Sequence, residues 1–550
     1  MLISNKNLNL AEELISIGIA LSSEKDTDKL LENILLGAKS ITHADGGTLY
    51  LLDEENKTLN FAIMQTDSLG IFKGGSTGEP IELQPIPLCN NGIENVHNIA
   101  AYAANKGQTV NINDAYCADG FDFSGVKNYD ENTGYRSTSF LAIPMKNHAN
   151  EIIGVLQLIN AQETETGNVV PFMPNDQRLA EALASQAAIV LTNNNLNLAL
   201  KDLLEKFIEI IAAAIDEKSP YTGGHCRRVP DIAMLLGKAV HNTVHGVHAQ
   251  TTFSDEEFYE LKIAALLHDC GKITTPVHVV DKATKLETIY DRIQTIDARF
   301  EIIRRELEIL MLREQLDISN LSSTEREKQL EQLNTEYQQQ LSIIAEEQEF
   351  LTRCNTGGEF MREDDQMRIR DIAQRTYNIN GEIQPLLNND EIENLCIPKG
   401  TLTDKERLII NNHIVLSQRM LQSLPFPKPL KNVPEIAGNH HERMDGKGYP
   451  NGLTKEQMSI QARIMGIADI FEALTATDRP YKKPMTISQA LNILGKMAEE
   501  QHIDADIFSV FIEQEVYLEY ANKTLSSEQI DHVDIDKIPG LNNNESARRA

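Results

Sequence analysis

Two short stretches of this sequence could support metal chemistry. His268 and Asp269 end the apolar run LKIAALLHD, and His440 and His441 open HHERMDGKGYP at residues 440–450. Adjacent histidines point in different directions on almost any backbone, so both serve one site only if it is extended, as a pair of metal ions is. An adjacent His–Asp pair can likewise hold two metals when its carboxylate bridges them. Each stretch alone also fits a surface turn or a capping Asp beside a core His.

Three further residues extend this set of donors. His225 and His413 lie on predicted helices, and Asp469 lies on an otherwise apolar helix face, where an unpaired acid is costly to bury. Imidazole and carboxylate donors without cysteine suit Fe, Mn or another divalent ion better than a thiolate-rich structural zinc site. Seven donors suit two ions, which hold a hydroxide at neutral pH and clamp the phosphoryl oxygens of an ester. The predicted ligands are His225, His268, Asp269, His413, His440, His441 and Asp469.

The length and composition limit the class of protein. A chain of 550 residues with 41% hydrophobic and 24% charged residues predicts about two to four soluble domains. The net charge of −30 argues against a nucleic acid polymer as partner, although a small anion could bind where cations gather. No apolar run reaches the roughly 18 residues of a membrane span, and acidic residues interrupt the N-terminal apolar stretch. Six cysteines without paired spacing fit a reducing cytosol, so we expect a cytoplasmic protein that does not bind membranes.

The N-terminal region, residues 1–180, is predicted to be mixed α/β. A helical pattern precedes two β-hairpins, at residues 46–65 and 137–160, and a second helix follows. This order, and the run DENTGYRSTSFLAIPMKN…EIIGVLQLIN, resemble a GAF domain over about residues 10–195. The resemblance implies a sensory module that binds a small-molecule ligand or dimerises. A structural dimerisation module without ligand is the alternative.

One subset of GAF domains binds cyclic nucleotides through an Asn-Lys…Phe-x-x-x-Asp-Glu signature. Asn160, Phe172 and Asp176 match that signature. Ala161 replaces its Lys and Gln177 replaces its Glu, so the Lys–Asp salt bridge of the subset is lost. The resemblance therefore does not extend to cyclic-nucleotide binding.

A connecting helix is predicted at residues 181–217. Its apolar positions step by four and three residues, a heptad pattern typical of a parallel coiled coil that joins two copies of the chain as a homodimer. A single helix packed on its own domain is the alternative. The seam consists of Leu196, Leu200, Leu203, Phe207, Ile210 and Ala214.

A second segment, residues 284–398, interrupts the histidine-bearing region. Apolar residues step by three and four from Leu286 to Leu310 and again from Leu330 to Ile344, on both sides of the polar stretch 319–324. This pattern predicts an inserted antiparallel coiled-coil hairpin. Residues 352–398 are polar and are interpreted as an irregular linker.

The motifs YTGGHxxRV, HDxGK, a lone helical His, HHERxDGxGYP and DxxxALTxxDRPYK follow one another along the chain. In this order they resemble the HD-GYP family of cyclic di-GMP phosphodiesterases, over about residues 200–280 and 398–520. The resemblance implies an all-α hydrolase domain at 218–283 and 399–525, followed by a tail at 526–550. The fold class is therefore multidomain α+β: an α/β GAF sensor, a connecting coiled-coil helix, and an HD-type domain containing the inserted hairpin.

The resemblance also implies roles for individual residues. His440 and His441 would reach different ions, Asp269 and Lys272 would act in catalysis, and Lys272 would also contact the phosphate. Asp445 would brace the loop that shapes the substrate pocket. The residues implied in substrate binding are Lys272, Gly448, Tyr449, Pro450, Arg479 and Lys482.

The expected reaction is hydrolysis of cyclic di-GMP to pGpG or GMP. Some members of the family have a Glu four residues before the first His, which permits a third metal. Tyr221 stands there in this chain, so two ions are expected. The alternatives are a catalytically weak receptor that signals by protein contact and an HD hydrolase of another cyclic dinucleotide.

Overall fold

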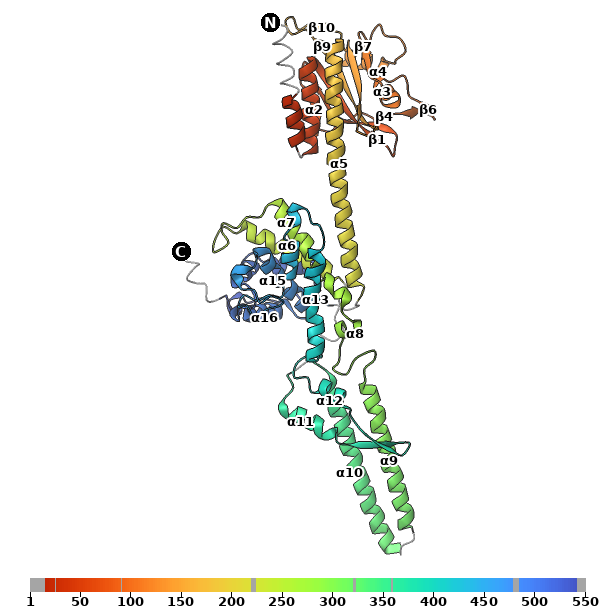
Figure 1. The fold of residues 1–550 in the computed structure, drawn as a ribbon, viewed down its shortest axis with the longest axis vertical. Coiled ribbons are helices and arrows are strands. Elements are labelled where there is room, and N and C mark those ends of the chain that lie inside the picture. Colours follow the sequence, from red (N-terminus) through yellow and green to blue (C-terminus); the bar gives the residue numbers. More distant parts are fainter. Residues whose placement is uncertain are drawn as a thin grey trace. The chain divides into compact units, whose positions relative to one another are not determined.

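The computed structural model divides into two compact units, Met1–Leu204 and Glu205–Ala550, which are considered separately (Figure 1). The fold combines α and β elements, with its large sheet confined to the first unit. None of the described helices combines the length and hydropathy that a bilayer crossing requires. The structure describes residues 15–24, 26–90, 92–218, 224–319, 323–357, 360–477 and 484–541.

The first unit is built on an antiparallel sheet with the strand order β3-β2-β1-β9-β8-β7. The two predicted hairpins are confirmed as β1–β2 and β8–β9, which pair antiparallel. The short strands β10 (Val169–Val170) and β4 (Ile86–Pro87) pair with β9 and β2, and Cys89–Asn90 and Ile93–Glu94 form a separate small ribbon. The strands of this order are β1 (Ala44–Asp53), β2 (Thr58–Thr66), β3 (Ile71–Gly74), β7 (Val110–Ile112), β8 (Phe140–Lys146) and β9 (Ile152–Gln162).

Helices cover both faces of this sheet, because alternate residues of its strands are apolar on each side. On β9, Leu156 and Leu158 pack against α2 (Thr27–Thr42) and the first part of α5 (Pro174–Asp216). Val155, the residue before Leu156, packs on the opposite face, against α3 (Ile99–Lys106). The helix α4 (Ser124–Thr133) follows β7 along the chain.

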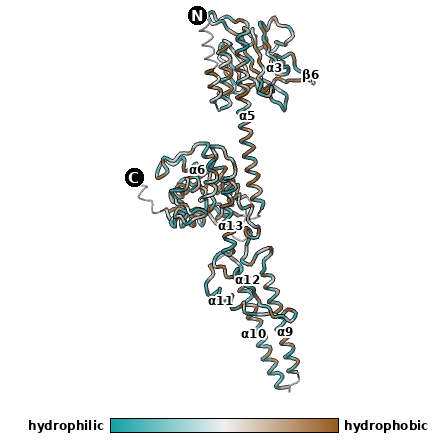
Figure 2. The backbone as a smooth tube through the Cα atoms, viewed as in Figure 1, coloured by the Kyte–Doolittle hydropathy of each residue, from teal (hydrophilic) through white to brown (hydrophobic). Residues whose placement is uncertain are grey.

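Helix α5 is one continuous helix of 43 residues, which contains the predicted connecting helix up to Asp216 and begins before it, at Pro174. Apolar and polar residues interleave along it (Figure 2). Ile208, Ala212 and Ile215 are buried on one face, whereas the heptad seam remains outside the chain's own core. The exposed fractions of the seam residues are 57% for Leu196, 65% for Leu200, 65% for Leu203, 60% for Phe207 and 65% for Ile210.

The second unit contains an all-α domain arranged around α6 (His225–Asn242), which packs against α7, α15, α17 and α18. Its helices bring together distant parts of the chain on the two sides of the insertion. The other helices are α7 (Asp255–Leu267), α8 (Val277–Val280), α13 (Asp404–Gln422), α14 (Val433–Gly438), α15 (Ile460–Thr475), α16 (Ile487–Glu499), α17 (Ala505–Glu513) and α18 (Val516–Thr524).

The insertion contains the predicted hairpin of two long helices, α9 (Ile293–Ile318) and α10 (Ser323–Asn355). The expected start near Leu286 is wrong. Leu286 is buried in a non-helical segment, and its backbone N–H donates to the Asn355 side chain at 2.8 Å. Ile289, in the same segment, is 97% exposed. The segment before α9 thus continues the apolar spacing without forming a helix.

Residues 352–398 are not an irregular linker. They form α11 (Glu363–Ile372), the hairpin β11 (Thr376–Ile379) and β12 (Glu382–Pro385), and α12 (Asn389–Leu395). The Asn380–Gly381 turn has positive φ at both residues, the conformation for which an Asn-Gly pair is suited. Three apolar residues of this segment join Phe300 and Ile344 of the hairpin in one core: Ile369, Leu386 and Leu395.

This shared core predicts that Phe300→Ala destabilises the insertion. Phe300 is fully buried, and removing a buried phenyl ring typically costs about 3–5 kcal/mol of unfolding free energy. Hydrogen exchange of peptides from 363–395 should accelerate together with that of α9, whereas peptides of the sheet should not change. Phe360→Ala is the matched control, because Phe360 is 76% exposed. Unchanged exchange in 363–395 would show that the two parts do not share a core.

Candidate metal centre

All seven predicted ligands meet inside the helical domain. They come from five separate stretches of the chain, and six of the seven are buried, His441 being partly exposed. His225 is the first residue of α6, His268 and Asp269 follow α7, and His413 lies within α13. His440 and His441 follow α14 by two and three residues, and Asp469 lies on α15.

Asp269 lies between two groups of histidines. Its Oδ2 is 3.2 Å from Nε2 of both His225 and His268, and its Oδ1 is 3.2 Å from Nε2 of His413. On the first side, Nε2 of His225 is also 3.3 Å from Asp469 Oδ1. The two carboxylate oxygens therefore face different donors, as the prediction of a bridging carboxylate requires.

Donor atoms gather within 4.8 Å of one another in three overlapping sets. His268 and His440 each belong to two of these sets, so the sets form one extended cluster. An extended cluster is what the adjacent histidines suggested. The sets are His225, His268 and Asp469; His268, Asp269 and His440; and His413, His440 and His441.

Orphaned polar atoms in this cluster fit divalent cations. Asp269 Oδ1, His413 Nε2 and His440 Nε2 are buried, and none of them forms a hydrogen bond with a described residue. A buried acceptor without a partner is costly, so native proteins rarely leave one without a hydrogen bond or an ion. Nitrogen and carboxylate oxygen donors that face one another satisfy this need when they bind a metal.

Three histidines are oriented by the same local device. The Nδ1–H of His268 donates to the carbonyl of Ala265 at 2.7 Å, and that of His440 donates to Ala437 at 2.6 Å. His413 donates to the carbonyl of Ile410 in the same way. Because a carbonyl only accepts, the proton lies on Nδ1 and the lone pair of Nε2 points into the cluster.

His225 needs a different partner, because it is the first residue of its helix. Its Nδ1 lies 2.5 Å from Glu472 Oε2, and the other oxygen of this carboxylate accepts from Arg228 Nε at 2.6 Å. Glu472 is buried and one helical turn beyond Asp469 on α15. Sequence reasoning missed it, although a second acid one turn from a predicted ligand was the available signal.

Electrostatics keep Asp269, His440 and His441 in the forms that bind metals. Burial alone would raise the pKa of the Asp269 carboxyl, but Lys272, whose Nζ lies 2.6 Å away, and His268 hold that pKa well below its usual range. Burial lowers the pKa of His441 to about 4 and that of His440 well below its ordinary value. The carboxylate is therefore ionised and these two imidazoles are neutral at pH 7.

The glycine of the HDxGK motif, Gly271, lies where a larger residue would not fit. A Cβ at this position would lie 2.0 Å from the carbonyl oxygen of His413, and the Gly271 N–H donates to Ser417 Oγ at 2.8 Å. The short helix that follows Asp269, Cys270–Thr274, thereby packs directly on α13. This contact fixes the spacing between Asp269 and His413.

The predicted substrate loop lies beside the cluster. The Tyr449 ring stacks on His441, with ring centroids 4.9 Å apart. A Cβ on Gly448 would lie 2.4 Å from Glu442 Cα, so only glycine fits. Glu442, missed from the sequence, accepts from the backbone of Asn451 at 2.7 Å and of Leu453 at 2.9 Å, on the far side of Pro450.

Asp445 braces the turn just before this loop. Its carboxylate accepts two hydrogen bonds from Arg443, at 3.0 and 2.9 Å, and one from the Lys447 backbone at 3.0 Å. The predicted phosphate-binding residues Arg479 and Lys482, and Tyr221, lie outside the described residues.

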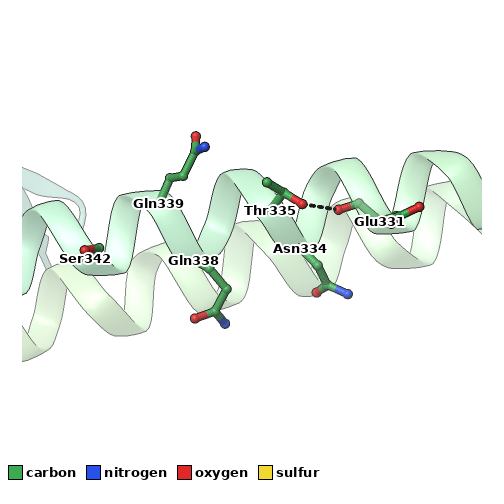
Figure 3. A pocket seen from close by; sticks show the side chains of 6 residues that line it. All are labelled: Glu331, Asn334, Thr335, Gln338, Gln339 and Ser342. Atoms are coloured by element: carbon green, nitrogen blue, oxygen red, sulfur yellow. Dashed lines mark hydrogen bonds between the residues drawn. The ribbon is translucent and has the colours of Figure 1, made fainter.

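A shallow hollow of about 710 Å³ lies elsewhere, along the outer face of α10 (Figure 3). Its side chains are amides and hydroxyls with a single carboxylate, so the hollow does not combine an acid with a base. Its lining residues are Glu331, Asn334, Thr335, Gln338, Gln339 and Ser342.

Comparison with known proteins assigns both parts of the chain. A GAF-domain family model matches residues 26–191, and two HD-domain family models match residues 222–345 and 369–507. Among solved structures, the GAF domain of a phosphoenolpyruvate-protein phosphotransferase from Coxiella burnetii is 13% identical and has a TM-score of 0.27, covering 35% of this chain and 98% of that one. The chain contains a GAF domain followed by an HD domain.

Relatives of the HD region are named as cyclic dinucleotide phosphodiesterases. A 3'3'-cGAMP-specific phosphodiesterase of Vibrio cholerae is 34% identical over 139 residues, 25% of this chain and 31% of that protein. Cyclic di-GMP phosphodiesterases of Pseudomonas aeruginosa and Thermotoga maritima are 39% and 33% identical over 114 and 117 residues, 20% of this chain in each case. The match covers 26% and 31% of those two proteins, so it spans about a third or less of each relative.

The contact between His225 Nδ1 and the Glu472 carboxylate predicts that Glu472→Gln weakens metal binding. The neutral amide keeps the size of the side chain but loses the charge that orients the imidazole, and such changes typically reduce metal affinity about 10–100-fold. Isothermal titration calorimetry of the metal-free full chain with Mn²⁺ measures the affinity. Glu528→Gln, at an exposed position, is the control. Equal affinities for both variants would mean that Glu472 does not support the site.

Proposed function

We propose that this protein is a metal-dependent phosphodiesterase that hydrolyses cyclic di-GMP to pGpG or GMP under control of its GAF domain. The observation that carries the proposal is the buried cluster of seven donors around the two-faced carboxylate of Asp269, with the Lys272 ammonium beside it. The names of the HD-region relatives point to the same substrate class.

The chain's own residues would divide the work as follows. His225, His268 and Asp469 would hold one divalent ion, Fe or Mn, and His413, His440 and His441 the other, with Asp269 shared. When bound, such a pair supplies a water of lowered pKa and positive charge for the phosphoryl oxygens. Asp269 keeps Lys272 protonated, because the carboxylate raises the pKa of the lysine against the effect of burial.

Lys272 is suited to stabilise the transition state. Its side chain is partly exposed, while Asp269, to which it donates, is almost fully buried. A fixed ammonium at the edge of the cluster would stabilise charge that develops on the phosphoryl group. Tyr449, stacked on His441, would form a wall of the pocket with Gly448 and Pro450.

Charge supports placing further cations at the substrate. The net charge of −30 repels a dianionic dinucleotide at long range, so local positive groups must overcome this field. Two divalent ions and Lys272 would do so, and we assign Arg479 and Lys482 to the phosphates as well.

A related cyclic dinucleotide is the second candidate substrate. It is favoured by the relative from Vibrio cholerae whose name specifies 3'3'-cGAMP. Assays with both dinucleotides, with products resolved by chromatography, separate the two substrates. A receptor that binds cyclic di-GMP without turnover would show binding and no product.

We further propose that the chain acts as a parallel homodimer through α5. The exposed seam, Leu196 to Ile210, repeats with heptad spacing, and from Leu196 onward another face of the helix is buried only near its end, at Ile208, Ala212 and Ile215. In this proposal residues 181–217, which include most of α5, would connect a GAF sensor at 1–180 to the hydrolase domain at 218–283 and 399–525, with the insertion at 284–398 and a tail at 526–550.

The catalytic proposal predicts that His268→Ala and Asp269→Ala abolish hydrolysis. Each change removes a donor from the centre of the cluster, so the metal content should fall from two ions per chain to one or none. Product analysis and elemental analysis of the full chain measure both effects, and circular dichroism checks the fold. An active preparation with a single ion per chain would contradict the two-ion site.

The dimer proposal predicts that Leu200→Lys together with Leu203→Lys produces monomers. Two charges in an apolar seam cannot be buried against a second helix without a large desolvation cost. Sedimentation velocity measures the change, and Lys201→Gln, at an exposed position between them, is the control. A wild-type chain that sediments as a monomer would overturn the proposal.

A further inference from the structure

The last turn of α5 contacts the backbone on both sides of His225. Asp216, the final residue of α5, is buried, and its Oδ2 accepts from the Gly224 N–H at 3.1 Å. Its Oδ1 accepts from the Cys226 N–H at 3.2 Å. One carboxylate thus holds the two residues that flank a predicted metal ligand.

Lys218, two residues later, holds a second part of the cluster. Its Nζ donates to the backbone carbonyls of Lys272 at 2.8 Å and Thr275 at 2.6 Å, and also to that of Ile273. Lys272 and Ile273 belong to the short helix Cys270–Thr274, which begins directly after Asp269, and Thr275 follows that helix. The end of α5 therefore contacts both segments that carry the ligands on one side of the cluster.

The N-terminus of α6 depends on this outside contact. The other long ligand-bearing helix, α13, is capped by its own Thr403, and α7 and α15 are capped by Ser254 and Ser459. The capping residue of α6 is Gly224, which has no side chain to offer. A carboxylate is the group preferred at a helix N-terminus, and here Asp216 provides it from α5.

We propose that Asp216 and Lys218 are positioning residues that clamp His225 and the Asp269–Lys272 turn to the end of α5, so that the rotational state of α5 sets the geometry of the metal cluster. The inference rests on the proposed function of that cluster. Because α5 is continuous from Pro174 to Asp216, a rotation of its seam reaches Asp216 without an intervening loop, and Lys218 follows two residues later. Small displacements of catalytic groups have large effects on rate.

The experiment changes the phase of α5 with and without the clamp. One residue inserted after Asn195 rotates the distal part of α5 by about 100°, whereas seven residues restore the heptad phase. In the wild-type background we expect the one-residue insertion to change the hydrolysis rate and the Mn²⁺ affinity at least about tenfold, and the seven-residue insertion to change each less than about twofold.

With Asp216→Asn and Lys218→Met combined, we expect the response to the one-residue insertion to fall below about twofold. Asn keeps an acceptor oxygen and Met keeps the length of the lysine side chain. Both replacements are therefore similar in size to the residues that they replace, which favours folding of the variant. The matched control is Glu217→Gln with Lys238→Met, two exposed positions that should leave the full response intact. Lys218→Arg, which retains the donors, should restore most of the response.

Mn²⁺ titration of the full chain separates this inference from the proposed reaction. If no form hydrolyses a cyclic dinucleotide but the Mn²⁺ affinity still follows the phase of α5 only when the clamp is intact, the clamp is supported and the proposed reaction is wrong. If the clamp variant responds to the insertions as the wild type does, the clamp is wrong whatever the reaction. If the combined variant does not fold, Lys218→Met alone gives the same comparison.

Discussion

The helical domain is organised around a buried group of donors that cannot satisfy one another. Carboxylates and imidazoles converge on one space, and Asp269 Oδ1, His413 Nε2 and His440 Nε2 form no hydrogen bond with the described residues. Lys272 contacts Oδ2 of Asp269 and leaves Oδ1 without a hydrogen bond. Buried polar atoms without partners are unfavourable, so this arrangement fits the binding of cations between the donors.

Hydrogen bonds to the ring nitrogens that face away from the cluster orient the histidine donors toward it. Three imidazoles use the carbonyl three residues earlier, which is available because each follows a turn of its own helix. His225 lacks such a turn and depends on Glu472, and its helix start depends on Asp216. His225, on the first turn of α6, is thus held by two other helices, α15 and α5. Among the predicted ligands it is the one whose position depends most on other parts of the chain.

The sequence predicted the domain order and the meeting of the seven donors, because residue types and motif spacing carry that information. It did not predict Glu472, Glu442, Asp216 or Lys218, since their roles depend on which element packs beside which. Residues 352–398 were misinterpreted because their core positions are few and spread over short elements; only the Asn380–Gly381 pair is a strong local signal. The helix expected from Leu286 failed because apolar spacing alone does not fix where a helix begins.

The insertion is tolerated because its two ends meet. Lys285, near its start, donates to the carbonyl of Ile397, near its end, at 2.7 Å. The carbonyl of Lys282 accepts from Thr401 at 2.9 Å, so the chain leaves and re-enters the domain at one place. The Lys282 ammonium also contacts both oxygens of Glu406 at 2.8 Å, and Glu406 caps the helix that carries His413. The join that closes the insertion is therefore also part of the support of a predicted ligand, which ties the folding of residues 284–398 to the geometry of the cluster.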